Sequence, residues 1–171
     1  MKLKDFSLTK QTALFFIFQF YIAIGLCQSL TGKVVGIMDG DSFKLLTLDS
    51  TVVRVRLANI DCPEKKQPFS AKATQFTADA IFGKMVTINI QKTDRYRRYI
   101  SNVIYNDSLS LCHELVKNGL AWHYVKYSKD KTLQEMEDKA KAAKVGLWQD
   151  PQPIAPWEWR SSKKKKKIKS E

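Results

Sequence analysis

The stretch RLANIDCPE, residues 56–64, joins a predicted strand to a predicted loop. Apolar and polar side chains alternate up to Leu57, with the period of a half-buried strand. Pro63 cannot continue a β-ladder and holds the preceding Cys62 in an extended or turn conformation. An arginine, an aspartate and a glutamate therefore sit where a rigid strand becomes a loop, a common place for functional groups. A solvated strand end with three ordinary charges is the alternative.

Four further strands and three helices are predicted around this stretch. The five strands cover residues 31–38, 42–48, 51–59, 84–92 and 99–105, and the helices cover 70–82, 111–118 and 130–145. Ser70 is the expected N-cap of the first helix, and Gly83 is its expected stop. Strands so short and closely spaced are typical of small barrels. We therefore predict an α+β fold, mainly β: a five-stranded oligonucleotide-binding (OB-fold) barrel with three packed helices.

The positive charge of the chain is concentrated at its two ends. The 171 residues carry a formal net charge of +12. Residues 160–171, a lysine-rich tail, contain seven basic residues and one acidic residue. Residues 28–159, the predicted domain, hold 19 basic and 15 acidic residues, so the charge of the body alone does not establish nucleic-acid binding. Pro151, Pro153 and Pro156 predict an extended segment that holds Trp157 and Trp159 before the tail.

Residues 1–27 have the pattern of a secretory signal peptide. Three lysines precede an apolar run from Ala13 to Leu26, which is too short for a comfortable membrane span. Gly25 and Cys27 are small residues at the spacing of a cleavage site, which predicts a cut after Cys27. A retained membrane anchor and a lipid on Cys27 are the alternatives. We expect a secreted or periplasmic protein.

Two aspartates are candidate metal ligands. Asp41 follows a tight turn and Asp61 ends a strand, so closure of the barrel could bring them face to face. Two carboxylates with backbone and water oxygens suit Ca²⁺, although Mg²⁺ or Mn²⁺ could bind the same groups. Aspartate is also favoured in turns, which is the alternative for both residues and the preferred role for Asp39.

Two arginines and a glutamate are candidates for catalysis on a phosphate. Arg56 and Arg98 each offer a planar fork of donors that matches two phosphate oxygens. Preorganised guanidiniums would stabilise the extra negative charge of five-coordinate phosphorus. Glu64 is a candidate general base for a water molecule. Ordinary ion pairs and solvated charges are the alternatives for all three. The rival bases, His113 and His123, lie far in sequence from the strand-end carboxylates and are taken as structural.

The tyrosines and cysteines of the predicted domain each have more than one possible role. Tyr96, Tyr124 and Tyr127 could stack on bases or contact a terminal phosphate, with core packing as the alternative for the last two. Cys62 and Cys112 could form a disulfide after export or remain two buried thiols.

Four motifs give residues 30–159 a resemblance to the staphylococcal (micrococcal) nuclease family. They are Asp39-Gly40-Asp41, residues 56–64, Asp94-Arg95-Tyr96-Arg97-Arg98 and Asn118-Gly119-Leu120-Ala121. The endings Gly146-Leu147-Trp148 and Pro156-Trp157-Glu158-Trp159-Arg160 resemble those of bacterial members. The resemblance implies an OB-fold barrel with three helices and a Ca²⁺-dependent phosphodiesterase that acts on DNA and RNA with little sequence preference.

The same resemblance implies a role for each site residue. Asp41 and Asp61 would bind calcium through their carboxylates, and Cys62 through its backbone carbonyl. Glu64 would be the general base, Arg56 and Arg98 the catalytic arginines, and Tyr96, with Arg95, part of the substrate pocket. The family's usual glycine before the second arginine is Arg97 here. We take Arg98 as the catalytic arginine because it keeps the spacing from Asp94 and precedes the fifth strand.

A non-catalytic binding module on the same barrel is the main alternative, since a fold does not determine a function. The complete charged set, residues 41, 56, 61, 64 and 98, favours the enzyme. We expect DNA and RNA as substrates and a monomer without an obligate protein partner. The tail would add nonspecific, salt-sensitive binding of polyanions.

Overall fold

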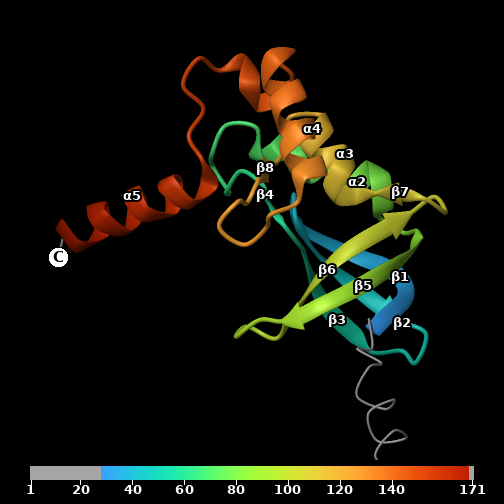
Figure 1. Ribbon diagram of the computed structural model, residues 1–171. Helices are drawn as coiled ribbons and strands as arrows, with labels where there is room; N and C mark the ends of the chain where they lie inside the picture. Colours follow the sequence, from blue (N-terminus) through green and yellow to red (C-terminus); the bar gives the residue numbers. More distant parts are fainter. Residues whose placement is uncertain (1–27, 170–171) are drawn as a thin grey trace, which may run out of the picture.

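A closed β-barrel forms the centre of the computed structural model, which describes residues 28–169 (Figure 1). Its five long strands are β1 (Gln28–Asp39), β2 (Ser42–Thr47), β3 (Val52–Leu57), β5 (Met85–Thr93) and β6 (Arg98–Tyr105). Neighbouring strands are antiparallel in the order β3-β2-β1-β5-β6, and a parallel pairing of β3 with β6 closes the ring. Short β7 (Leu109–Ser110) pairs with the end of β6. The predicted five-stranded α+β barrel of the OB-fold type is confirmed.

The stretch 56–64 does more than end a strand. Strand β3 stops at Leu57, two residues short of the prediction. Asn59 has a φ of 66°, in the left-handed region that asparagine tolerates better than most residues, and it turns the chain away from β3. The chain then forms β4 (Ile60–Asp61), which pairs antiparallel with β8 (Trp122–His123). Asp61 is therefore held in a second, small sheet instead of a free loop.

The three predicted helices are present as α2 (Ser70–Ile81), α3 (Leu111–Lys117) and α4 (Lys131–Ala142). Asp130 caps α4, because its carboxylate accepts hydrogen bonds from the N–H groups of Thr132 and Leu133. The expected N-cap of α2 is wrong by one residue. Ser70 is the first helical residue, and the N-cap position is held by Phe69 without a side-chain hydrogen bond. A 3₁₀ turn, η1 (Gly146–Gln149), follows α4.

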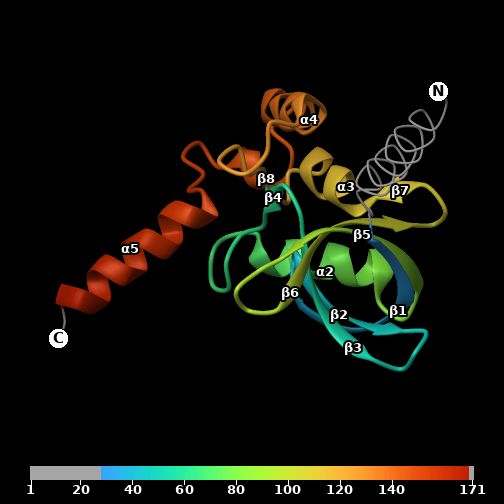
Figure 2. The same cartoon turned by 60° about the horizontal axis from the view of Figure 1, so that its bottom comes forward.

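One hydrophobic core joins the barrel to α2, α3 and α4. Its members are fully or almost fully buried, and they include Val34, Phe43, Leu45, Val55, Leu57, Ile88 and Val103 from strands and Ala73, Ile81, Leu111, Leu115 and Leu133 from helices. A smaller cluster of Ala140, Leu147 and Trp148 lies against Trp122. The helices thus cover one end of the barrel, and the two views agree on this arrangement (Figures 1 and 2).

The C-terminal segment departs from the prediction. Pro156 is not extended but is the first residue of helix α5 (Pro156–Lys169), which projects away from the body in both views (Figures 1 and 2). A proline at this position loses no helical hydrogen bond. The negative charge of Glu158, in the first turn, interacts favourably with the positive N-terminal end of the helix dipole. The predicted signal peptide, residues 1–27, lies outside the described residues. None of the helices within residues 28–169 is long and apolar enough to cross a membrane.

Candidate functional site

All the predicted site residues line one open cleft of ≈ 560 Å³ at the edge of the barrel. They are Asp41, Arg56, Asp61, Cys62, Glu64, Arg95, Tyr96 and Arg98. The residues come from the β1–β2 turn, the end of β3, β4 with the loop that follows it, and the β5–β6 loop with the start of β6. Tertiary folding therefore brings together in one concave surface the residues that the sequence places in three separate stretches.

Close packing at Gly40 places Asp41. A Cβ atom built on Gly40 would lie 2.8 Å from the Cβ atom of Ala73 in α2 and 3.0 Å from that of Cys62. The Gly40 carbonyl also accepts a hydrogen bond of 2.6 Å from the Thr77 hydroxyl in α2. The turn can approach the loop so closely that the Cys62 N–H donates to Asp41 Oδ2 at 2.9 Å. The Asp41 carboxylate is thereby fixed beside β4.

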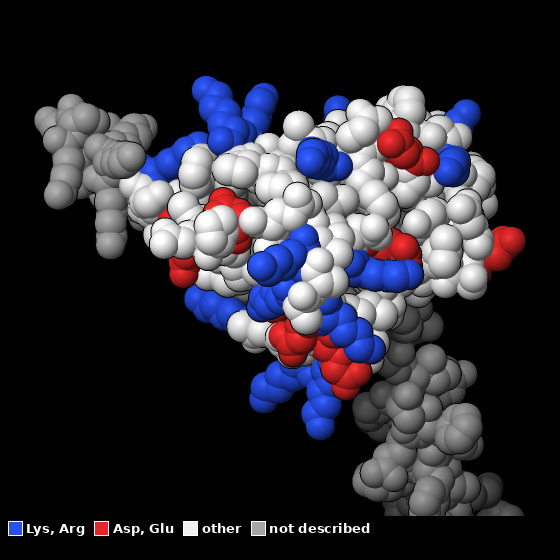
Figure 3. Space-filling model, turned by 90° about the horizontal axis from the view of Figure 1, so that it is seen from above, with Lys and Arg blue, Asp and Glu red and all other residues white. Residues whose placement is uncertain are grey.

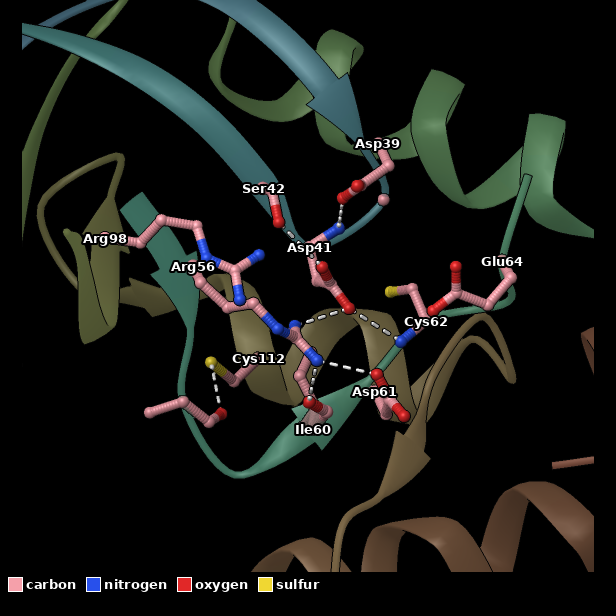
Figure 4. A network of polar contacts seen from close by, with 12 residues as sticks. Asp39, Asp41, Ser42, Arg56, Ile60, Asp61, Cys62, Glu64, Arg98 and Cys112 are labelled. Carbon is pink, nitrogen blue, oxygen red and sulfur yellow. Dashed lines mark hydrogen bonds and ion pairs between the residues drawn. The ribbon is translucent and has the colours of Figure 1, made fainter. Parts of the chain in front are cut away.

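Arg56 lies between the two predicted metal-binding carboxylates (Figure 4). Its Nη1 atom is 2.5 Å from Asp41 Oδ2, and its Nη2 atom is 2.6 Å from Asp61 Oδ1. Burial lowers the pKa of Arg56, but the charges of Asp41 and Asp61 outweigh this and raise it. The ion pairing that the sequence left as an alternative for Arg56 is therefore present. It holds both carboxylates at one wall of the cleft.

Asp39 adds negative charge to the same wall. Its Oδ1 accepts a hydrogen bond of 3.2 Å from the Asp41 N–H, as its predicted turn-forming role requires. Burial and the neighbouring charge of Asp41 raise the pKa of Asp39 to about 7. A bound cation would offset this repulsion.

The donor set fits a hard cation. Within residues 28–169 no cluster of three or more His, Cys, Asp or Glu residues is arranged to hold a metal ion. The carboxylates of Asp41 and Asp61 would therefore need backbone and water oxygens to complete a coordination shell, as Ca²⁺ accepts. The backbone carbonyl of Cys62, next to Asp61, is within the same cleft-lining loop.

Gln67 fixes the loop that presents Glu64. The Glu64 N–H donates to Gln67 Oε1 at 2.9 Å, and Gln67 Nε2 donates to the Ile154 carbonyl at 2.6 Å. Gln67 is buried, whereas the Glu64 side chain is 37% exposed at the cleft. Sequence reasoning gave Gln67 no role, because a glutamine in a polar loop carries no motif. Its two contacts show that it ties Glu64 to the C-terminal segment.

Arg98 begins β6 and reaches the cleft, whereas exposed Arg97 is not among the residues that line it. Arg97 has a φ of 59°, in the left-handed region that favours glycine, the residue that the family resemblance implies at this position. The placement favours the choice of Arg98. Tyr96 is 54% exposed, and the guanidinium of Arg95 lies 4.9 Å from the centre of its ring.

The two histidines lie outside the cleft lining. His123 is buried, and its ring nitrogens are 3.0 Å from Gln134 Oε1 and from Ser128 Oγ, as expected of a structural residue. Cys62 and Cys112 are buried free thiols. Burial raises the pKa of Cys112 to about 12 and that of Cys62 well above its ordinary value, so both thiols stay protonated at neutral pH.

Arg160 joins the site from the far end of the chain, and sequence reasoning missed it. Its Nη2 atom is 2.7 Å from Asp61 Oδ2, and its Nη1 atom is 2.5 Å from Glu64 Oε1. The sequence placed Arg160 at the start of the basic tail, although the motif that ends with it was a signal of some role. Tyr124 and Tyr127 also line the cleft, and the Tyr124 ring stacks on Trp157 at 5.0 Å.

The chain is similar to several proteins named as nucleases. The family model described as "Staphylococcal nuclease homologue" matches residues 54–150. An "Uncharacterized endonuclease" of Escherichia coli is 37% identical over 138 residues, which cover 81% of this chain and 90% of that protein. A "Micrococcal nuclease" of Shigella flexneri is 37% identical over 144 residues, which cover 78% of this chain and 82% of that protein. An "Uncharacterized endonuclease" of Haemophilus influenzae is 39% identical over 134 residues, which cover 78% of this chain and 75% of that protein. The chain therefore belongs to the staphylococcal nuclease family.

Proposed function

We propose that this protein is a Ca²⁺-dependent nuclease that hydrolyses phosphodiester bonds of both DNA and RNA. One observation carries the proposal: a single cleft gathers two carboxylates suited to a hard cation, two arginines and a glutamate at its rim. The names of the relatives, endonuclease and micrococcal nuclease, support the same reaction class. Membership of the staphylococcal nuclease family also supports hydrolysis of phosphodiester bonds, and the side chains in the cleft supply the chemistry for it.

Glu64 is the proposed general base. Its half-exposed carboxylate can take a proton from a water molecule, whose oxygen then forms a bond to phosphorus. The phosphorus–oxygen bond to the leaving nucleotide breaks, and the leaving oxygen takes up a proton from solvent. A positioned base of this kind contributes about 10²–10⁴-fold in rate.

Arg56 and Arg98 are the proposed stabilisers of the transition state. Both reach the cleft. Two aspartates, Asp41 and Asp61, orient Arg56, and Asp94 orients Arg98. Guanidiniums fixed in advance need little reorganisation when negative charge grows on the phosphoryl oxygens. Calcium, when bound at Asp41 and Asp61, would supply Lewis-acid polarisation of a phosphate oxygen.

The aromatic side chains at the cleft are proposed to bind the nucleotide. The cleft is lined by Tyr96, Tyr124 and Tyr127, and by Arg95 next to Tyr96. Aromatic faces stack on any base, which gives binding with little sequence preference. Sugar-nonspecific cleavage is consistent with such contacts.

The direct test follows hydrolysis of single-stranded DNA and of RNA by a chain that begins at Gln28. Reactions with Ca²⁺, with Mg²⁺ and with chelator are compared for the wild type, Glu64→Gln and Arg56→Ala. We expect cleavage of both polymers in Ca²⁺, loss of cleavage with chelator, and a drop of about 10²-fold or more in each variant. Binding without cleavage under every metal would instead identify a binding module.

Two further parts of the proposal concern the ends of the chain: export directed by residues 1–27 and polyanion binding by the lysine-rich tail. We propose that residues 1–27 direct secretion or periplasmic residence, which fractionation of cells that express the full chain would test.

The face in Figure 3 mixes basic and acidic side chains, in keeping with the mild net charge of residues 28–159. We therefore assign added polyanion binding to the tail, and removal of residues 161–171 should weaken DNA binding at low salt without abolishing turnover.

A further inference from the structure

Asp61 is held by two arginines that differ in accessibility. Arg56 contacts its Oδ1 atom at 2.6 Å, and Arg160 contacts its Oδ2 atom at 2.7 Å. The Asp61 side chain is 1% exposed, the Arg56 side chain 14% and the Arg160 side chain 40%. Both oxygens of this carboxylate are thus engaged by guanidiniums, and Arg160 is the more exposed of the two partners.

The first turn of α5 fixes Arg160 in this position. Trp157 stacks on Tyr124 with ring centres 5.0 Å apart, and Trp159 lines an apolar pocket with Pro63 and Phe69. Ala155 and Pro156, where the helix begins, are buried. The contact of Arg160 with Asp61 and Glu64 is therefore built into the packed body and is not a chance contact of a free tail.

We propose that Arg160 is a further active-site arginine beside Arg56 and Arg98, which competes with the cation for Asp61 and then binds the substrate phosphate. The inference rests on the proposed nuclease function. A dication at Asp61 would face two guanidiniums within hydrogen-bonding distance of one carboxylate, and like charges so close repel strongly. We expect Arg160 to be the side chain that moves, since it is 40% exposed, whereas Arg56 is 14% exposed and also bridges to Asp41.

Arg160 lines the cleft that we propose receives the phosphate, so its side chain can leave Asp61 and stay in that cleft. Its planar fork, which spans Asp61 and Glu64, matches two phosphate oxygens equally well. Release from Glu64 also frees that carboxylate to accept a proton. Calcium and phosphate would thus reinforce each other's binding through one side chain, because coupling between two ligands is reciprocal.

Calcium titration calorimetry on the chain from Gln28 tests the competition without any turnover. Arg160→Gln should bind Ca²⁺ about fivefold more tightly than the wild type, the size expected for loss of one half-exposed ion pair. Lys163→Gln is the matched control: it removes the same charge one turn further along α5, where Lys163 contacts the Trp159 ring at 5.0 Å. The control should leave the calcium affinity unchanged.

Steady-state cleavage of single-stranded DNA supplies the second readout. Arg160→Gln should raise KM about fivefold or more, and Arg160→Lys, which keeps the charge but loses the fork, should recover part of it. A merely structural role would not combine tighter calcium binding with a higher KM. Unchanged or weaker calcium binding by a folded Arg160→Gln would overturn the inference while leaving the nuclease intact. A wild type that neither binds Ca²⁺ nor cleaves would overturn the proposed function itself.

Discussion

Asp94 holds Arg98 by both its backbone and its side chain. Asp94 Oδ1 accepts the Arg98 N–H at 2.9 Å, and Asp94 Oδ2 accepts Nε at 2.8 Å. Oδ1 also accepts the N–H of Tyr96 at 2.8 Å, so one carboxylate shapes the whole β5–β6 loop. Because the side-chain bond uses Nε, it leaves the two terminal nitrogens of Arg98 for a phosphate in the cleft.

The contacts of Asp94 with Arg98 predict that Arg98 and its neighbour Arg97 differ in their effect on cleavage. Arg98→Ala should lower kcat about 10²–10³-fold, the usual effect of removing one preorganised donor to a transition-state oxyanion. Arg97→Ala should change kcat by less than about threefold, since Arg97 is exposed and outside the cleft lining. Cleavage assays on purified variants measure both. Equal losses in the two variants would contradict the assignment of Arg98.

Asp94 should make a pH-dependent contribution to stability. Burial raises its pKa, but hydrogen bonds and the charge of Arg98 outweigh this and leave the pKa lowered. A lowered folded-state pKa stabilises the protein above the unfolded value of about 4, and this contribution is lost as the pH falls through the folded value.

Asp94→Asn should therefore destabilise the protein by up to about 1 kcal/mol at pH 7, the range for an ion pair near the surface. The difference from the wild type should shrink below about pH 4. Urea unfolding at both pH values measures it. A difference that stays constant or grows on acidification would rule out the charge as its source.

Gly40 should not tolerate a side chain. A Cβ on Gly40 would meet Ala73 at 2.8 Å and Cys62 at 3.0 Å, so Gly40→Ala must push the β1–β2 turn away from α2 and from Cys62. We expect a loss of about 1–3 kcal/mol in stability and weaker calcium binding, because Asp41 moves with the turn. Gly36→Ala is the control, since its nearest neighbour is the Lys44 side chain at 3.7 Å. Unfolding curves that agree for the two variants would disprove the close packing.

Gly146 should be far more sensitive to substitution than Gly83. Both have left-handed backbones, with φ of 58° and 74°, so an alanine at either site costs about 1 kcal/mol in backbone strain. A Cβ on Gly83 meets nothing within 4 Å, whereas one on Gly146 would lie 2.2 Å from the Gly119 carbonyl oxygen. Chemical denaturation should show a clearly larger loss for Gly146→Ala than for Gly83→Ala. Similar losses would mean that the loop near Gly119 moves freely.

The barrel strands could be read from local patterns with small errors at their ends. Alternation over residues 84–92 and 99–105 anticipated β5 and β6 because each strand has one face on the core. The observed end of β3 differs from the predicted one because of a single residue. Asn59 has a left-handed φ, which turns the chain and ends the strand at Leu57. Pro156 misled the prediction because proline disrupts a helix interior but suits its first turn.

The candidate site was found as three charged motifs, but not as a set of contacts. Each motif gave the residue types, since carboxylate and guanidinium chemistry is local to a side chain. The bridge of Arg56 to Asp41 and Asp61 depends on the register that pairs Ser42 with Arg56 and on the pairing of β4 with β8. The support that Gln67 gives to Glu64 had no sequence signal at all, because an amide becomes specific only through its partners.

The sequence by itself determined the class of fold, the order of its elements and the chemical kinds of group in the cleft. Those properties follow from hydrophobic period, turn residues and side-chain chemistry, which act over a few neighbouring positions. Only the tertiary structure decided that Arg160, 99 residues beyond Asp61, enters the site, and that Asp61 lies between two guanidiniums. Contacts across such a distance depend on the packing of Trp157 and Trp159 against the body, which no local pattern encodes.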